Sequence, residues 1–325
     1  MPLTDSQGRR ISYLRLSVTD RCNLRCRYCM PPEGIAKLTH NDILSFENLH
    51  RIAVQAVKLG LDKIRVTGGE PLVRKGVVEF LARLAAICGL TELVLTTNGI
   101  LLSQMAAELR CAGVQRLNVS LDSLRPDTFA RVTRGGELRR VLDGLEAAER
   151  AGFPPPKINM VVMRGVNDDE VLDFAALTLH KQYSVRFIEY MPILQDPEWQ
   201  SLWVSGDEVL KRIEQRYSLQ RLSTPERAGP ARNFRIRGAT GTLGIISPVS
   251  HRFCENCNRI RITARGTAKG CLFGGDEVDL KPYLQGDDET LQEVLRQVVT
   301  RKPLWHNLLP GQDAPAPLAM AYIGG

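Results

Sequence analysis

Hydrophobic and polar residues alternate in two ways along the first two-thirds of the chain. Six short runs rich in β-branched and apolar residues have the pattern of buried strands. Between them, apolar residues recur at three- and four-residue spacing, which is typical of one face of a helix. The strand candidates are residues 13–18, 63–67, 92–97, 116–121, 157–163 and 185–191. The clearest helix candidates are residues 46–58, 77–87, 138–151 and 169–180.

This order of strand, helix and strand predicts right-handed βαβ units and a parallel sheet. Six such strands suit either a partial α/β barrel or a doubly wound sheet. In both folds, function gathers in the loops at the carboxyl ends of the strands. Residues with distinctive chemistry follow the strand candidates here, among them Cys22, Glu70, Asn98 and Asp122.

The pattern changes after about residue 192. One helix candidate (207–217), two strand candidates (233–237 and 242–246) and a late helix (288–300) follow. A proline-rich stretch at 310–317 is typical of an extended linker, and the apolar residues 319–323 predict a segment that docks. We therefore expect a first part over residues 1–215 and a smaller C-terminal part over residues 216–325.

Composition narrows the function classes. With 43% hydrophobic and 24% charged residues, the 325-residue chain falls in the globular range. No apolar run reaches the roughly 18–20 residues of a membrane span, and the first residues lack the features of a secretory signal, so we expect a cytoplasmic protein. The net charge of +7 fits nucleic acid or a small anionic substrate, and does not choose between them.

Six of the eight cysteines form two triplets, whereas a disulfide framework is not expected in a cytosolic chain. The first triplet is Cys22, Cys26 and Cys29, in a C-x3-C-x2-C pattern. Three thiolates in one loop suit an iron–sulfur cubane whose fourth iron is open to another ligand. The alternative is zinc, completed by a distant His or Cys.

The second triplet is Cys254, Cys257 and Cys271, for which zinc completed by His251 is the alternative. Arg259 and Arg261 follow at once. Alternation along a strand would place both guanidiniums on one face, and guanidinium pairs match phosphate oxygens.

The first triplet, with Tyr28 before its last cysteine, resembles the signature of radical S-adenosylmethionine (SAM) enzymes. Gly68-Gly69-Glu70-Pro71 resembles the Gly-Gly-Glu motif of the same superfamily. The resemblance implies a 4Fe–4S cluster on the three cysteines, with its open iron bound by the methionine amino and carboxylate groups of SAM. It also implies that the Gly-Gly-Glu motif contacts the methionine amino group of SAM. We interpret the two glycines as allowing close backbone approach to a ligand, and Glu70 as an acceptor for an ammonium.

The whole chain resembles the GTP 3′,8-cyclase family, also called molybdenum cofactor biosynthesis protein A. The matching stretches are residues 14–23, 65–72, 95–99, 118–122, 186–191, 253–261 and 322–325. The resemblance implies a partial (β/α)6 TIM-type barrel with a smaller C-terminal α+β part that closes the open side. It implies a lyase that forms (8S)-3′,8-cyclo-7,8-dihydroguanosine 5′-triphosphate, the first step of molybdenum cofactor biosynthesis.

The resemblance also assigns roles to residues. It implies two 4Fe–4S clusters, one on each cysteine triplet. The implied SAM contacts are Tyr28, Gly69, Glu70, Ser120 and Met191. The implied GTP contacts are Arg15, Arg65, Thr96, Lys157, Arg186, Arg259, Ile260 and Arg261. The terminal Gly324 and Gly325 are implied to reach the active site, where a chain end without side chains can enter a narrow passage.

Partners follow from the same resemblance: GTP, a reducing electron donor of the flavodoxin or ferredoxin type, and cyclic pyranopterin monophosphate synthase downstream. It implies no nucleic acid or membrane partner, and a monomer or homodimer. Independently, four basic residues lie on four separate strand candidates, where they could converge on one polyanion: Arg15, Arg65, Lys157 and Arg186. Cys88 and Cys111 are expected to be small core residues.

Two rival functions stay open from the residues alone. One is a radical SAM enzyme that modifies a peptide, against which the arginine pair and the Gly-Gly end argue. The other is a zinc-stabilised module that binds nucleic acid, which predicts basic residues interleaved with aromatic ones. Only 6% of the residues are aromatic.

Overall fold

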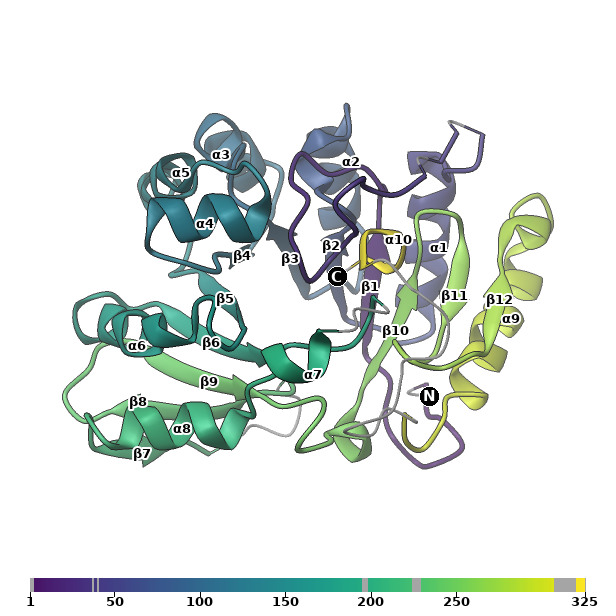
Figure 1. Cartoon of the computed structure of the whole chain (residues 1–325). Helices are drawn as coiled ribbons and strands as arrows, with labels where there is room; N and C mark the ends of the chain where they lie inside the picture. The colour runs from purple at the N-terminus through teal and green to yellow at the C-terminus, as the bar shows by residue number, and fades with distance from the viewer. Residues whose placement is uncertain are drawn as a thin grey trace.

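A single twelve-stranded sheet organises the chain. The computed structural model describes residues 3–36, 38–39, 41–194, 198–223, 229–306 and 320–324. Within them the strand order is β12-β11-β10-β1-β2-β3-β4-β5-β6-β9-β8-β7. The strands from β10 to β9 are parallel, and the outer pairs are antiparallel. The sheet curves without closing, as a partial TIM-type barrel does, and helices α1 to α6 lie on its outside (Figure 1).

The six predicted strands are confirmed, with ends that differ by at most two residues. They are β1 (Tyr13–Ser17), β2 (Lys63–Thr67), β3 (Glu92–Thr97), β4 (Arg116–Ser120), β5 (Lys157–Val162) and β6 (Ser184–Glu189). The helices between them are α1 (Phe46–Lys58), α2 (Val77–Ala85), α3 (Leu102–Cys111), α4 (Pro126–Thr133), α5 (Leu138–Arg150) and α6 (Val171–His180). The sequence pattern identified α1, α2, α5 and α6.

The C-terminal part adds strands to both edges of this barrel. β9 (Thr242–Ile246) pairs with β6 and continues into β8 (Arg232–Ile236) and β7 (Leu219–Arg221). β10 (Arg259–Ile262) pairs with β1 and continues into β11 (Thr267–Lys269) and β12 (Glu277–Asp279). The remaining helices are α7 (Trp199–Leu202), α8 (Gly206–Glu214), α9 (Asp288–Thr300) and α10 (Met320–Ile323). The division at residue 215 stays a prediction, and the proline-rich stretch 310–317 lies outside the described residues.

The alternation of apolar and polar residues along the strands separates a hydrophobic layer, between the sheet and the helices, from a polar interior of the barrel. Leu14 and Leu16 of β1 are fully buried in the layer between sheet and helices. Tyr13, Arg15 and Ser17 alternate with them and face the inside of the curve. Burying each leucine contributes about 1.5–3 kcal/mol, which fixes the register of the strand and so aims the arginine inward.

Cys88 and Cys111 are exposed on the surface, so their assignment to the hydrophobic core was wrong. Cys88 lies in the turn after α2, and Cys111 is the last residue of α3, where a side chain can reach solvent.

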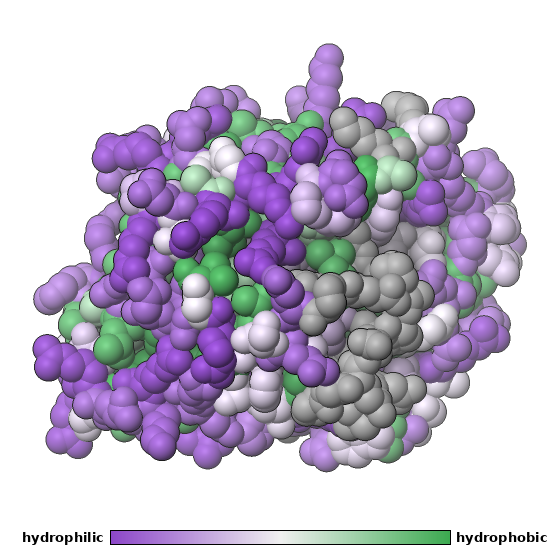
Figure 2. All heavy atoms as spheres, viewed as in Figure 1, coloured by the Kyte–Doolittle hydropathy of each residue, from purple (hydrophilic) through white to green (hydrophobic). Residues whose placement is uncertain are grey.

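Hydrophilic residues predominate on the face shown in Figure 2, and hydrophobic ones gather near its centre. Among the described residues, no helix is long and apolar enough to cross a membrane.

Candidate active site

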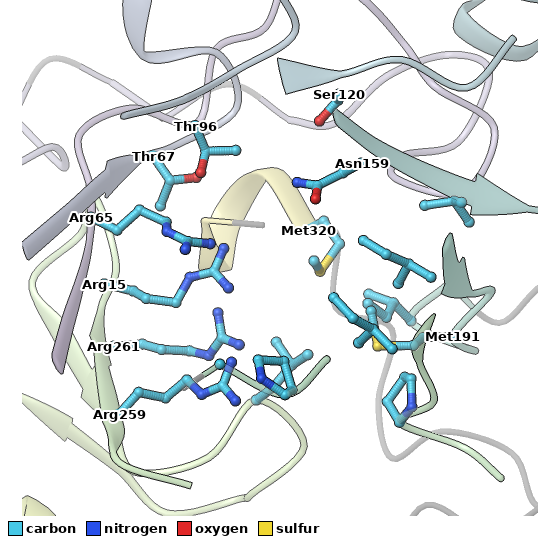
Figure 3. A pocket seen from close by; sticks show the side chains of 18 of the residues that line it. Arg15, Arg65, Thr67, Thr96, Ser120, Asn159, Met191, Arg259, Arg261 and Met320 are labelled. Carbon is cyan, nitrogen blue, oxygen red and sulfur yellow. The ribbon is translucent and has the colours of Figure 1, made fainter. Parts of the chain in front are cut away.

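A cavity of about 320 Å³ occupies the inside of the curved sheet, and all six triplet cysteines line it. Four arginines from three neighbouring strands form one wall and point into it (Figure 3). We call this set the basic row: Arg65 on β2, Arg15 on β1, and Arg261 and Arg259 on β10. The register of the strands aligns these side chains, because Arg15 of β1 pairs with Arg65 on one side and with Arg261 on the other. The predicted convergence of Arg15, Arg65, Lys157 and Arg186 is confirmed, because all four line this cavity.

The facing wall carries polar and sulfur-containing side chains. Ser120, Asn159, Met191 and Met320 lie across the cavity from the basic row in Figure 3. The other predicted residues that line the cavity are Tyr28, Gly69, Glu70, Thr96, Lys157 and Arg186. Ile260 does not: it is fully buried in the hydrophobic core. Alternation along β10 turns it away from Arg259 and Arg261, so only its main chain can face a ligand.

Several buried polar atoms of the cavity wall have no hydrogen-bond partner among the described residues. They are Tyr13 Oη, Arg15 Nε, Arg65 Nε, Thr96 Oγ1, Asn159 Oδ1, Arg186 Nε and Arg259 Nε. Leaving a buried polar group unpaired costs on the order of 1–3 kcal/mol. The cavity therefore fits a ligand that carries many hydrogen-bonding atoms.

The electrostatics of the cavity favour an anion. Burial, and then repulsion from Arg261, lower the pKa of Arg15 well below its usual value. Burial also lowers the pKa of Arg186 and of Arg261 to about 10 each, with Arg65 and Arg259 as the respective neighbouring cations. So many cations held together in a buried space indicate a polyanionic ligand.

The first cysteine triplet lies in the loop after β1, which packs on the Gly-Gly-Glu motif. Gly69 N donates to Thr19 O at 2.7 Å, and a Cβ on Gly69 would lie 2.4 Å from Arg21 O. A Cβ on Gly68 would lie 2.7 Å from Thr19 O. Glycine is thus required for the close approach of the cysteine loop's main chain. Gly68 and Gly69 also line the cavity, so the close approach of a ligand stays a prediction.

Glu70 ties this motif to the end of β3. Its Oε1 accepts from Leu72 N at 3.0 Å and Thr97 Oγ1 at 2.8 Å, and its Oε2 accepts from Asn98 N at 2.7 Å. Asn98 Nδ2 donates to Asn23 Oδ1 of the cysteine loop at 2.8 Å. Burial raises the pKa of Glu70 to about 7. Both carboxylate oxygens already have partners within the chain, so Glu70 holds the loop in shape.

Tyr28 is oriented by a buried carboxylate. Its Oη donates to Asp122 Oδ2 at 2.9 Å, while Val161 N donates to Asp122 Oδ1 at 2.9 Å. Asn167 Nδ2 donates to Asp122 O at 2.7 Å, which fixes the loop after β4. The sequence identified Asp122 only as a polar residue after a strand, and gave no sign of its partner.

Other residues of the wall were missed. Tyr13, Lys63, Thr67, Asn159 and Met320 line the cavity. The alternation of inward positions on β1, β2 and β5 could have identified the first four. Nothing in the pattern could have placed Met320.

The two cysteine triplets differ in their electrostatics. Burial raises the pKa of Cys22 to about 11 and of Cys29 to about 12. Burial also acts to raise the pKa of Cys257, but Arg259 and Lys302 lower it to about 6. No three His, Cys, Asp or Glu side chains of the described residues are grouped to hold a single metal ion. A cubane makes a different demand, because its thiolates bind separate irons.

The chain end docks beside the first triplet. Met320 N donates to Cys29 O at 3.2 Å, Tyr322 Oη donates to Ala36 O at 2.6 Å, and Ile323 is buried. Gly324 O accepts from Arg261 Nη1 at 3.4 Å. The predicted docking of this apolar stretch is confirmed for residues 320–323, whereas Gly325 lies outside the described residues.

Comparisons of sequence place this site in a known class. A family model of the radical SAM superfamily matches residues 16–178, and one of Molybdenum Cofactor Synthesis C matches residues 183–308. The barrel with its cysteine loop is therefore that of a radical SAM enzyme, a class that uses SAM and an iron–sulfur cluster.

Full-length relatives narrow the family. The GTP 3′,8-cyclase of Geobacter sulfurreducens is 62% identical over 100% of both chains. That of Peptoclostridium acidaminophilum is 48% identical over 95% of both chains. The chain belongs to the GTP 3′,8-cyclase family.

Solved structures agree on the fold. The SuiB protein of Streptococcus suis bound to SAM superposes with a TM-score of 0.60 at 14% identity, covering 91% of this chain and 67% of SuiB. Its structure with the precursor peptide SuiA gives a TM-score of 0.62 at 15% identity, covering 91% of this chain and 66% of SuiB. At such identities the likeness concerns the fold alone.

Proposed function

We propose that this enzyme cyclises GTP to (8S)-3′,8-cyclo-7,8-dihydroguanosine 5′-triphosphate, the first step of molybdenum cofactor biosynthesis. The observation that carries the proposal is one cavity lined by both cysteine triplets and by the basic row. A nucleoside triphosphate needs several cations for its phosphates and polar partners for its base and ribose. The unpaired arginine nitrogens of the cavity wall offer the cations, and its unpaired Tyr13, Thr96 and Asn159 oxygens offer the polar partners.

The six cysteines would hold two 4Fe–4S clusters, each with one iron open. Electrostatic coupling among Cys22, Cys26 and Cys29, and among Cys254, Cys257 and Cys271, indicates that each triplet is grouped in space. When bound, the first cluster supplies the electron that cleaves SAM into methionine and a 5′-deoxyadenosyl radical.

SAM would lie between the first triplet and the wall that carries Ser120 and Met191. Tyr28, held by Asp122, would shape one side of its site, and Gly69 would offer its main chain. Glu70 would act through the loop that it fixes. These positions would hold the 5′ carbon of the radical near the ribose of GTP and away from water.

GTP would lie along the basic row. Lys63 and Lys157 are the first residues of β2 and β5, and Arg65 and Arg186 are the third residues of β2 and β6; these four would bind the triphosphate. Arg259, Arg261 and the second triplet would hold the purine end, with Thr96 and Arg15 between. This arrangement would point C3′ of the ribose toward the SAM site.

Arg15 provides a test of GTP binding. We expect Arg15→Ala to weaken GTP binding about ten- to a hundredfold, because a charge-assisted hydrogen bond contributes about 1.5–3 kcal/mol. Equilibrium binding with the clusters intact measures this. Arg139→Ala is the control, since that side chain is 79% exposed. Equal GTP affinity in the Arg15 and Arg139 variants would contradict the placement.

Lys157 gives a test that depends on pH. Burial, and then nearby cations, lower its pKa to about 6, so its amine is mostly neutral at pH 7.5 without ligand. A triphosphate favours the charged form and raises this pKa. We therefore expect GTP binding near pH 7.5 to be accompanied by proton uptake. The native protein should take up close to one proton more than the Lys157→Met variant. Calorimetry in buffers of different ionisation enthalpy measures the difference, and equal proton uptake in both proteins would refute it.

The remaining partners belong to the same proposal. The electron would come from a flavodoxin or ferredoxin type of donor, and the product would pass to cyclic pyranopterin monophosphate synthase in the cytoplasm. A peptide substrate remains the rival within the superfamily. Anaerobic protein should be brown, with about eight irons and little zinc per chain. With GTP, SAM and a reductant it should form 5′-deoxyadenosine and cyclised nucleotide. About four irons, or no reaction of GTP, would count against the proposal.

A further inference from the structure

A buried lysine lies behind the second cysteine triplet. Lys302 follows α9 and is 3% exposed. Its Nζ donates to Arg259 O at 3.0 Å and to Gly270 O at 2.5 Å, and its charge lowers the pKa of the nearby Cys257 thiol. None of the carboxylates among the described residues forms an ion pair with it. A fully buried lysine without such a partner is rare, and calls for an anion nearby.

The contacts of Lys302 join the two segments that carry Cys257 and Cys271. Arg259 is two residues beyond Cys257, and Gly270 immediately precedes Cys271. A Cβ on Gly270 would lie 3.2 Å from Lys302 Cα, so glycine lets the lysine backbone pack closely here. The ammonium therefore ties together the two segments that carry these cysteines.

Arg9 holds the segment that carries the third cysteine, Cys254, in a different way. Its Nη1 donates to Cys254 O at 2.8 Å and its Nη2 to Pro303 O at 2.9 Å. Its Nε forms a buried ion pair with Asp5 Oδ2 at 2.6 Å. The charge of Arg9 is thus neutralised, whereas that of Lys302 is directed at a cysteine sulfur.

A positive charge and a hydrogen bond at a ligating sulfur favour the reduced, more negative state of an iron–sulfur cluster. Hydrogen bonds to the sulfurs, net charge and burial together set the reduction potential. Lys302 supplies a buried positive charge beside Cys257.

We propose that Lys302 is a positioning residue that also raises the reduction potential of the second cluster. It would fix the Cys257 and Cys271 segments through carbonyl contacts, and hold its ammonium against the Cys257 sulfur. The inference rests on the proposed second cluster. It explains how that cluster could accept an electron readily next to the substrate.

The test is a redox titration of anaerobically reconstituted, full-length protein followed by electron paramagnetic resonance. A variant with Cys22, Cys26 and Cys29 replaced by alanine identifies the signal of the second cluster. In Lys302→Met we expect the ratio of reduced to oxidised second cluster at a fixed potential to fall about tenfold, which is about 59 mV for one electron. Lys302→Arg should restore most of the native ratio.

Arg51→Met is the matched control, because Arg51 binds Leu284 O and Gly286 O at the other end of α9, away from the cysteines. We expect no shift of the potential in that variant. If Lys302→Met does not fold, Lys302→Gln carries the same measurement, since it removes the charge and keeps a donor. An unchanged potential in the charge-free variant, or the same shift in Lys302→Arg, would overturn the inference. A native protein without a second signal would instead refute the proposed second cluster.

Discussion

Replacing Cys22 with serine should reduce formation of 5′-deoxyadenosine to background. Cys22 lines the cavity with Cys26 and Cys29, and its Sγ accepts from Leu24 N at 3.4 Å and from Asn98 Nδ2 at 3.8 Å. A cluster anchored by three thiolates has no spare ligand, so losing one leaves it with too few anchors. We expect the variant to lose close to half of its iron together with SAM cleavage.

Cys88 provides the control for this experiment. It is exposed in a turn beyond α2 and outside the cavity, so Cys88→Ser should keep full iron content and native SAM cleavage. Cys257→Ser should behave differently from both, since it should lose iron from the second site without a complete loss of SAM cleavage. Native rates of 5′-deoxyadenosine formation in Cys22→Ser would mean that the first triplet is not the SAM site.

A methyl group at position 324 should abolish cyclisation while leaving both clusters in place. Gly324 has a φ of +77°, which non-glycine residues rarely adopt, and a Cβ there would lie 2.8 Å from Ser17 Cβ and 3.0 Å from Thr67 Cγ2. Its carbonyl also accepts from Arg261, a proposed GTP contact. Displacement of a reacting group by about 1 Å can cost a hundredfold in rate, and we expect at least that loss of cyclised product from Gly324→Ala.

Gly152 is the matched control, because its φ is +76° and nothing lies within 4 Å of its Cβ position. Gly152→Ala shares the backbone strain of Gly324→Ala but not its steric contacts, so it should retain native turnover. Deleting Gly324 and Gly325 should match Gly324→Ala, and added peptide ending in Gly-Gly should restore some activity. Full turnover by the truncated protein at saturating GTP would show that the tail is dispensable.

The barrel could be predicted from the sequence because its pattern is local. Buried parallel strands such as Glu92–Thr97 are short apolar runs, and helices such as Phe46–Lys58 have one apolar face, so their bounds could be predicted to within a few residues. The convergence of Arg15, Arg65, Lys157 and Arg186 could be predicted because they lie on two pairs of neighbouring strands of one parallel sheet.

Other features depend on contacts between residues far apart in the chain, and no local pattern encodes them. The pairing of β10 with β1 and of β9 with β6 joins segments separated by more than fifty residues. The hydrogen bond between Tyr28 and Asp122, and the position of Lys302 behind Cys257, are of the same kind. Glycine at position 69 was expected from the motif, but its physical reason became clear only from the packing of two loops.

The most direct test of the account follows a hydrogen atom from substrate to SAM. The proposed binding of both reactants in one cavity would bring C3′ of GTP next to the 5′-deoxyadenosyl radical, so GTP carrying deuterium at C3′ should transfer one deuterium to 5′-deoxyadenosine. Mass spectrometry should find this label in the nucleoside, together with an equal amount of cyclised nucleotide. Unlabelled 5′-deoxyadenosine formed alongside unchanged GTP would contradict the assignment of both reactants to this cavity.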